Sequence, residues 1–379
     1  MKLKLLHVIP SYLPAVRYGG PMRSVHGLCR ALAARGHTVD VLTTNVDGAG
    51  ESGAPVGRPV DLDGVRVRYF RAAVRRLYYA PAMARALSEA VVEADVVHLH
   101  SVFLWPTLAA ARRARRAGVP YVVSPRGMLV EDLIRRRGRL RKRAWLLLFE
   151  RRTIEQAAAV HLTSALERRD LEAFPWRVAD TWTIPNGIGG VDRAEPAARE
   201  PSRVLFLGRI NWKKGLDRLI RALAHAPAAR LVVAGNDEEN LTPALRRLAR
   251  ELGVHERVAF VGVVEGEAKW ELLRTAALLA LPSYSENFGN VVLEAWSTGC
   301  PVLVTPEVGL AEDVQRHRAG AVCAGDPETL GTTLATLLAN PAQLQAFGAA
   351  GQEAVAREYG WDAIAARMEA HYLRLAARS

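Results

Sequence analysis

The sequence predicts an α/β fold built from two doubly wound domains. The chain has 379 residues, more than one typical domain of about 100 to 150 residues holds. Short apolar segments alternate with segments of helical periodicity, a pattern typical of βαβ units and a parallel sheet. A stretch rich in Gly, Pro and charge around residues 188 to 202 interrupts this alternation. We therefore predict a linker there, with one domain on each side.

Each apolar segment is interpreted as a buried strand of one of the two sheets. In the first domain a helix opening at Pro21 and closing at Gly36 separates the first two strands, and another helix ends at Gly118. We expect the first domain at 1–190, the second at 191–360, and a last helix within 361–379 that possibly packs back on the first domain. The strands are expected at 3–9, 38–44, 95–100 and 120–124, then at 203–208, 229–235, 257–262, 277–283 and 301–305.

Composition limits the classes of function. A net charge of +12 implies an anionic partner: a nucleic acid, a phosphorylated substrate or a membrane surface. Cys29, Cys300 and Cys323 lack the spacing of metal ligands, which favours a reducing compartment. His7 and Pro10 interrupt the first apolar stretch, so we interpret it as a strand and not as a signal peptide. We expect a cytoplasmic protein.

Two acids bracket a glycine turn in the stretch from 285 to 301. We expect a helix to begin near Asn290, so that its free amides form an anion site and Gly289 lets a phosphate approach the backbone. Glu286 would lie before this helix and Glu294 one turn inside it. Because carboxylates only accept hydrogen bonds, they suit the hydroxyl-rich sugar and ribose on the two sides of a diphosphate. The alternative is that Glu286 favours a helix N-terminus and Glu294 lies on a solvated face.

A second motif supports the diphosphate interpretation. The segment 208–215 follows an expected strand, so Arg209 and Lys214 would leave the strand end into the same site, at turns made by Gly208 and Gly215. A guanidinium and an ammonium can hold a diphosphate and stabilise its charge as it leaves. Taken alone, these residues could also be solvated loop charges.

Three motifs in this order resemble one enzyme family. Gly-Arg-x4-Lys-Gly at 208–215, Glu-x7-Glu at 286–294 and Pro-Asn-Gly at 185–187 look like the retaining GT-B glycosyltransferases of family 4, also called glycosyl transferases group 1. The resemblance covers nearly the whole chain and implies the GT-B fold, two Rossmann-like domains that face a central cleft. No Gly-x-Gly-x-x-Gly follows the first strand, which argues against a nicotinamide dehydrogenase.

The resemblance implies a function and roles for individual residues. It implies a metal-independent enzyme without a cofactor that transfers a sugar, with retention, from a UDP- or GDP-linked donor to a glycan or lipid-linked acceptor. Polysaccharide or lipopolysaccharide biosynthesis is the implied pathway. The implied catalytic residues are Glu286, His100, Arg209 and Lys214. The implied donor-binding residues are Gly20, Arg209, Lys214, Glu286, Phe288, Gly289, Asn290 and Glu294, and the implied acceptor-binding residues are Gly19 and Arg126.

Several finer expectations accompany these roles. The base of the donor would be read by backbone groups around Gly262 and Val263. We expect His98 to point to the face of its strand opposite to His100. A tight turn at Gly19 and Gly20 and a structural His100 remain alternatives. No Asp-x-Asp of the chain suggests a metal site.

A basic segment suggests a second surface. Residues 135–152 contain nine basic residues and one acid around an apolar group that includes Trp145 and Phe149, as in segments that lie on anionic lipid. A core helix with a solvated basic face is the alternative. A nucleic-acid partner would not explain the pair of Glu286 and Glu294, so we expect no nucleic-acid partner. A nucleotide-sugar epimerase of the same fold and a non-enzymatic sugar-binding protein are the competing functions.

Overall fold

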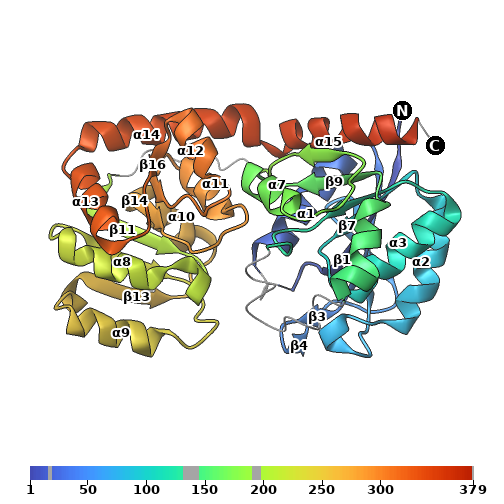
Figure 1. The fold of residues 1–379 in the computed structure, drawn as a ribbon, viewed down its shortest axis with the longest axis horizontal. Coiled ribbons are helices and arrows are strands. Elements are labelled where there is room, and N and C mark those ends of the chain that lie inside the picture. Colours follow the sequence, from blue (N-terminus) through green and yellow to red (C-terminus); the bar gives the residue numbers. More distant parts are fainter. Residues whose placement is uncertain (16–18, 131–144, 190–197, 378–379) are drawn as a thin grey trace. The chain divides into compact units, whose positions relative to one another are not determined.

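The computed structural model describes residues 1–15, 19–130, 145–189 and 198–377. The chain forms two compact units (Figure 1). Unit 1 comprises residues 1–187 together with 361–379, and unit 2 comprises residues 188–360. The C-terminal helix α15 (Trp361–Ala376) thus belongs to the same unit as the N-terminal half of the chain.

Unit 1 is built on an eight-stranded sheet in the order β10-β9-β8-β7-β1-β2-β6-β5. All neighbouring strands run parallel except β5 and β6, which are antiparallel. The order reverses at β1, whose neighbours are β2 and β7. The strands are β1 (Lys4–Ser11), β2 (Thr38–Thr44), β5 (Pro59–Leu62), β6 (Val65–Phe70), β7 (Val96–His100), β8 (Tyr121–Ser124), β9 (Ala159–Leu162) and β10 (Thr181–Thr183), beside a small hairpin of β3 (Val46–Asp47) and β4 (Gly50–Glu51).

Helices cover both faces of this sheet. On one face α2 (Pro81–Glu93) and α3 (Trp105–Ala117) pack Leu87 and Ala110 against Leu99 of β7. On the other face α1 (Gly20–Ala34) and α15 pack together against the strands. Two shorter helices, α6 (Arg151–Glu155) and α7 (Ala165–Glu172), follow later, with a 3-10 turn at Arg75–Leu77 and a π turn at Leu146–Glu150.

Unit 2 contains a six-stranded, fully parallel sheet in the order β13-β12-β11-β14-β15-β16. The strand order reverses between β11 and β14, the arrangement of a doubly wound nucleotide-binding domain. Its strands are β11 (Glu200–Leu207), β12 (Arg230–Ala234), β13 (Val258–Gly262), β14 (Ala276–Leu281), β15 (Val302–Val304) and β16 (Gly320–Val322).

The helices of unit 2 bury an apolar core on each face of the sheet. Leu219 and Leu334 belong to one core, and Val292 and Trp296 belong to the other. The helices are α8 (Leu216–Ala222), α9 (Thr242–Glu251), α10 (Gly266–Thr275), α11 (Asn290–Ser297), α12 (Ala311–His317), α13 (Pro327–Leu338) and α14 (Pro341–Ala354), with 3-10 turns at Trp212–Lys214, Leu223–His225 and His255–Arg257 and a π turn at Val355–Tyr359.

Every strand predicted from an apolar segment is present, with ends that differ by a few residues. The predicted linker, 188 to 202, extends too far, because β11 begins at Glu200, which pairs with Ala276 of β14. Of the basic segment 135–152, residues 135–144 lie outside the described part of the chain. Among the described residues, no helix combines the length and the apolar character needed to cross a membrane.

Candidate functional site

The predicted donor residues of unit 2 lie at the point where its strand order reverses. The loop 208–215 follows β11 and the loop 282–289 follows β14, and these two strands are neighbours in the sheet. Because parallel strands end at the same edge, both loops leave the carboxyl edge side by side. This is the edge where open α/β sheets bind their ligands.

Lys214 and Glu286 join these two loops. The Lys214 ammonium forms a short ion pair with the Glu286 carboxylate, and 15% and 18% of their side-chain surfaces are exposed. Gly215 makes this approach possible: its φ is 64°, and a Cβ there would lie 2.0 Å from the carbonyl oxygen of Pro282. The lysine and the acid expected at one site are therefore in direct contact.

Backbone hydrogen bonds to the loop after β15 hold the loop that contains the Phe288-Gly289-Asn290 turn. The main chain of Glu286 bonds to the loop after β15, its N–H donating to Glu307 O (2.9 Å) and its carbonyl accepting from Gly309 N (2.9 Å). Phe288 is buried, and Gly289 precedes α11 with a φ of 92° and no side-chain cap. Because α11 begins at Asn290 as predicted, its first amides lie beside Glu286 at the same sheet edge.

Arg209 has a partner that the sequence analysis missed. Its guanidinium forms an ion pair with Glu238 (2.8 Å), which also accepts a hydrogen bond from Asn211 Nδ2 (2.9 Å). Glu238 follows β12, the other neighbour of β11 in the sheet. The acidic stretch after that strand was the available signal, since adjacent parallel strands end at one edge.

Glu294 also has a partner that was not predicted. Its carboxylate accepts from Lys269 Nζ of α10 at 2.8 Å, and Lys269 lies 4.4 Å from the ring centroid of Trp270. Unit 2 thus holds each predicted charged donor residue in an ion pair with an opposite charge. Gly262, with a φ of 76°, is the last residue of β13, and the exposed Val263 follows it.

In unit 1 the corresponding edge lies where β1 and β7 adjoin. Gly19 has a φ of 74° and directly precedes α1, which begins at Gly20. His100 is the last residue of β7 and is fully buried. Ser101 and Phe103, which follow it, have φ values of 77° and 65°, and Arg126, which follows β8, has 57°. Such conformations are strained for residues with a side chain and gather at functional sites.

Arg126 contacts two of the other predicted residues. Its guanidinium donates to Asn186 Oδ1 at 2.7 Å and to His100 Nδ1 at 3.3 Å, so residues of the motif at 185–187 and of two strand ends meet. Since an arginine can only donate, His100 carries its proton on Nε2 and donates it to His7 Nδ1, 2.9 Å away. Both ring nitrogens of His100 are therefore engaged within the protein.

The expectation for His98 was wrong. Successive side chains alternate across a strand, so residues two apart share a face, and the rings of His98 and His100 are 4.2 Å apart. His98 Nδ1 lies 2.5 Å from the hydroxyl of Tyr372 on α15. Burial, with the charge of Arg126, lowers the pKa of His7 to about 3 and the pKa values of His98 and His100 well below the usual value. The three rings are neutral at pH 7.

These three histidines also offer nitrogen atoms within 4.8 Å of one another, a spacing that could hold a metal ion. Two observations favour a hydrogen-bonded network instead. His7 and His100 are bonded directly to each other, and the guanidinium of Arg126 already occupies the remaining nitrogen of His100. A cation here would have to displace both bonds and lie beside a positive charge.

Models of two protein families match this chain. The model for glycosyl transferases group 1 matches residues 191–354. The model for a glycosyl transferase 4-like domain matches residues 19–187. The first match contains the ion-paired loops of unit 2, and the second contains His98, His100 and Arg126 of unit 1 but not His7.

Individual proteins agree with the family models. A D-inositol 3-phosphate glycosyltransferase of Mycobacteroides abscessus is 30% identical over 346 residues, 83% of this chain and 76% of the relative. D-inositol 3-phosphate glycosyltransferase 2 of Catenulispora acidiphila is 36% identical over 225 residues, a match that spans only about half of either chain (53% and 52%). The Anabaena protein Alr3699/HepE, solved in complex with UDP-glucose, has a TM-score of 0.74 at 17% identity and covers 98% of this chain and 100% of its own. The fold is thus GT-B, and the chain belongs to the group 1 family of glycosyltransferases.

Proposed function

We propose that the protein transfers a sugar from a nucleoside diphosphate donor, UDP- or GDP-linked, to a glycan or lipid-linked acceptor. The observation that carries this proposal is the contact between Lys214 and Glu286 at the carboxyl edge of unit 2, with Arg209 on the same loop as Lys214. Cations for a diphosphate and a carboxylate for sugar hydroxyls stand side by side there. Family membership supports the same reaction.

The ion pairs of Arg209, Lys214 and Lys269 each contribute at least one proposed donor contact. Lys214 and Arg209 bind the diphosphate, helped by the amides of Phe288, Gly289 and Asn290. Glu286 accepts hydrogen bonds from the sugar, and Glu294 accepts them from the ribose. Backbone groups at Gly262 and Val263 contact the base.

The proposed reaction retains the configuration at the anomeric carbon and needs no metal ion. The bond between that carbon and the diphosphate oxygen breaks, and the acceptor hydroxyl oxygen forms a bond to the same face of the sugar. The proton of the acceptor hydroxyl passes to the departing diphosphate. Lys214 and Arg209 stabilise the negative charge that develops on the leaving group, a task that a divalent ion can otherwise perform.

The existing contacts of the side chains in unit 1 limit the roles proposed for them. His100 would contact the transferred sugar only after exchanging its bond to Arg126 or to His7, because both ring nitrogens are occupied. An acidic acceptor would likewise reach Arg126 only after an exchange of partners: its side chain is half-buried, its guanidinium donates to Asn186 and His100, and its Nε is buried without a hydrogen-bond partner among the described residues. Gly20 would border the donor and Gly19 the acceptor.

We further propose a cytoplasmic enzyme of polysaccharide or lipopolysaccharide assembly that binds an anionic membrane surface through residues 135–152. The described end of this segment supports the membrane contact, since Leu148 is 67% exposed and is followed by the exposed Arg151 and Arg152. Lipid-linked acceptors would then be met at the surface where they reside.

Thermal-shift binding of UDP, GDP and ADP, without metal, tests the donor site. A diphosphate at 100 times its Kd stabilises by about 2.7 kcal/mol, roughly 5 to 10 °C for a domain of this size. We expect one of the three nucleotides to shift the wild type and Arg209→Ala to lose the shift. Arg247→Ala, which removes an exposed arginine from α9 of the same unit, should keep it.

Two outcomes would contradict the proposal. If no diphosphate shifts the wild type with EDTA present, the donor site is absent or needs a metal ion. If Arg209→Ala retains the full shift, the nucleotide binds elsewhere. A positive shift should be followed by detection of sugar transfer, because an epimerase would convert the donor without an acceptor.

A further inference from the structure

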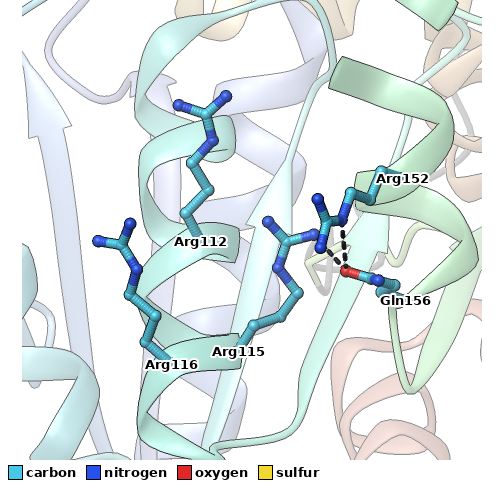
Figure 2. A pocket seen from close by; sticks show the side chains of 5 residues that line it. All are labelled: Arg112, Arg115, Arg116, Arg152 and Gln156. Atoms are coloured by element: carbon cyan, nitrogen blue, oxygen red, sulfur yellow. Dashed lines mark hydrogen bonds between the residues drawn. The ribbon is translucent and has the colours of Figure 1, made fainter. Parts of the chain in front are cut away.

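A pocket on unit 1 is lined almost entirely by arginines, and neither the proposed reaction nor the predicted site residues use it (Figure 2). Its volume is about 460 Å³, within the range of roughly 300 to 1,000 Å³ found for small-molecule sites. Figure 2 shows three arginines rising from α3 and one facing them from α6. The lining residues are Arg112, Arg115, Arg116, Arg152 and Gln156.

Helix geometry places the three arginines of α3 together. Residues 112, 115 and 116 are related by three and four positions, so they share one face of the helix. Like charges at these spacings destabilise a helix, and Arg152 from α6 adds a fourth charge. Burial lowers the pKa of Arg115, and the charges of Arg152, Arg112 and Arg116 lower it further.

This positive charge is not neutralised by acids of the described chain. Among the residues that the structure describes, none of the four arginines forms an ion pair with a carboxylate. Glu155, one turn from Arg152, pairs with Arg151 at 3.0 Å. Arg113 points away, to Ser88 Oγ (3.0 Å) and Ala109 O (3.1 Å).

Among the described residues that line the pocket, the polar partner of the arginines is a neutral amide. Gln156 Oε1 accepts hydrogen bonds from Arg115 and, at 3.4 Å, from Arg152 Nε, which holds these two guanidinium groups in place from opposite elements (Figure 2). Arg112 lies over the ring of Phe149, 5.4 Å from its centroid. The other donors of the guanidinium forks stay available for an anion with several oxygen atoms, and phosphate oxygens match such forks.

We propose that this pocket binds a phosphate or diphosphate group. Such a group can belong to a free solute or to a lipid headgroup, and the pocket chemistry is the same for both. The lipid source has a neighbouring apolar contact in Leu148, which is 67% exposed and lies one turn before Arg152. None of the residues that line the pocket is a proposed donor residue, and all proposed donor residues except Gly20 belong to unit 2.

Calorimetric titration of sodium pyrophosphate, without divalent metal and at low salt, tests the site. The full chain would carry Arg209→Ala and Lys214→Ala, so that the proposed donor residues do not contribute. We expect binding to remain in this background and to weaken at least tenfold when Arg112→Gln and Arg116→Gln are added. Both arginines are exposed, so the fold should persist, which a melting curve of each variant checks. Arg30→Gln, an exposed arginine on α1 at the opposite face of the sheet, should leave binding unchanged.

Sedimentation with vesicles distinguishes the two sources. One set contains phosphatidylcholine alone and the other also contains phosphatidic acid. Binding to the acidic vesicles that depends on Arg112 and Arg116 would identify a lipid headgroup, and pyrophosphate binding without vesicle binding would identify a free phosphate. If neither pyrophosphate nor acidic vesicles bind, or if the double glutamine variant binds as its parent does, the proposal is wrong. None of these results depends on sugar transfer, so they are independent of the proposed enzymatic function.

Discussion

Replacing Lys214 by alanine tests both the chemistry and the structure of the proposed donor site. The substitution removes the cation that contacts Glu286 at the carboxyl edge of unit 2. Loss of one positioned group that stabilises developing charge typically lowers kcat about 10² to 10³-fold, or roughly 2.7 to 4 kcal/mol. We expect a loss of this size in the transfer rate. Lys214→Arg keeps the charge and should retain part of the activity.

The same substitution also destabilises the protein without ligand. It leaves the Glu286 carboxylate, only 18% exposed, without its partner, which we expect to cost about 1 to 3 kcal/mol of unfolding free energy. Adding Glu286→Gln removes the unpaired charge, so the double variant should regain stability but not activity. Arg247→Ala, which removes an exposed cation from α9 of the same unit, is the matched control.

Urea unfolding and initial rates at saturating donor measure the two effects separately. A Lys214→Ala protein that keeps its rate to within about threefold would refute a role in stabilising the leaving group, since so small a change is under 1 kcal/mol. A rate that returns together with stability in the double variant would refute it as well. In that case Lys214 would serve only to hold the two loops together.

Three further predictions concern the backbone, the histidine cluster and the second glutamate. Gly215→Ala should destabilise unit 2 by several kcal/mol more than Gly253→Ala in thermal unfolding, because both have a positive φ (64° and 66°) but only at Gly215 would a Cβ meet a carbonyl oxygen, at 2.0 Å. His161 of β9 adjoins the cluster, with its ring 5.3 Å from that of His98. His7 and His161 have pKa values of about 3 when folded and 6.5 ordinarily, so the unfolded chain binds more protons below pH 6.5. Unfolding free energy should therefore fall by about 2 kcal/mol per histidine from pH 7 to 5, and a flat profile in pH-dependent melts would show that the rings are not buried and neutral. Glu294→Gln should raise the KM for the donor roughly tenfold with little change in kcat, as expected for loss of a ribose contact, and a fall in kcat alone would contradict that role.

The sequence predicted the fold better than it predicted contacts within the site. The strand expected at 277–283 is visible because a continuous apolar segment ends there in polar or small residues. The start of α11 was located because Gly289 precedes a segment whose apolar residues recur at helical spacing. The two residues of an ion pair can be far apart in the sequence. Glu238 is 29 residues from Arg209, and Lys269 is 25 residues from Glu294, so only the order of strands in the sheet brings them together.

Unit 1 shows two different limits of sequence reasoning. The face of His98 follows from the two-residue period of a strand and could have been predicted correctly. Its contact with Tyr372 could not, because it joins residues 274 positions apart and depends on where α15 packs. The arginines of α3 are evident as a helical pattern, but the pocket requires Arg152 from a helix that the pattern does not reveal.

The paired charges of unit 2 would let the proposed donor site be stable before the donor binds. Arg209, Lys214 and Lys269 each neutralise one glutamate, so no charge of these three pairs is left alone at a partly buried edge. In the proposed site, a nucleotide sugar would offer phosphate oxygens to Lys214 and Arg209 and hydroxyl donors to Glu286 and Glu294. For the pair of Lys214 and Glu286, donor binding could then exchange partners without leaving either charge uncompensated. A ligand with phosphates but no hydroxyl groups, such as pyrophosphate, would free the carboxylates without replacing their partners, and it should bind this edge more weakly than the complete donor does.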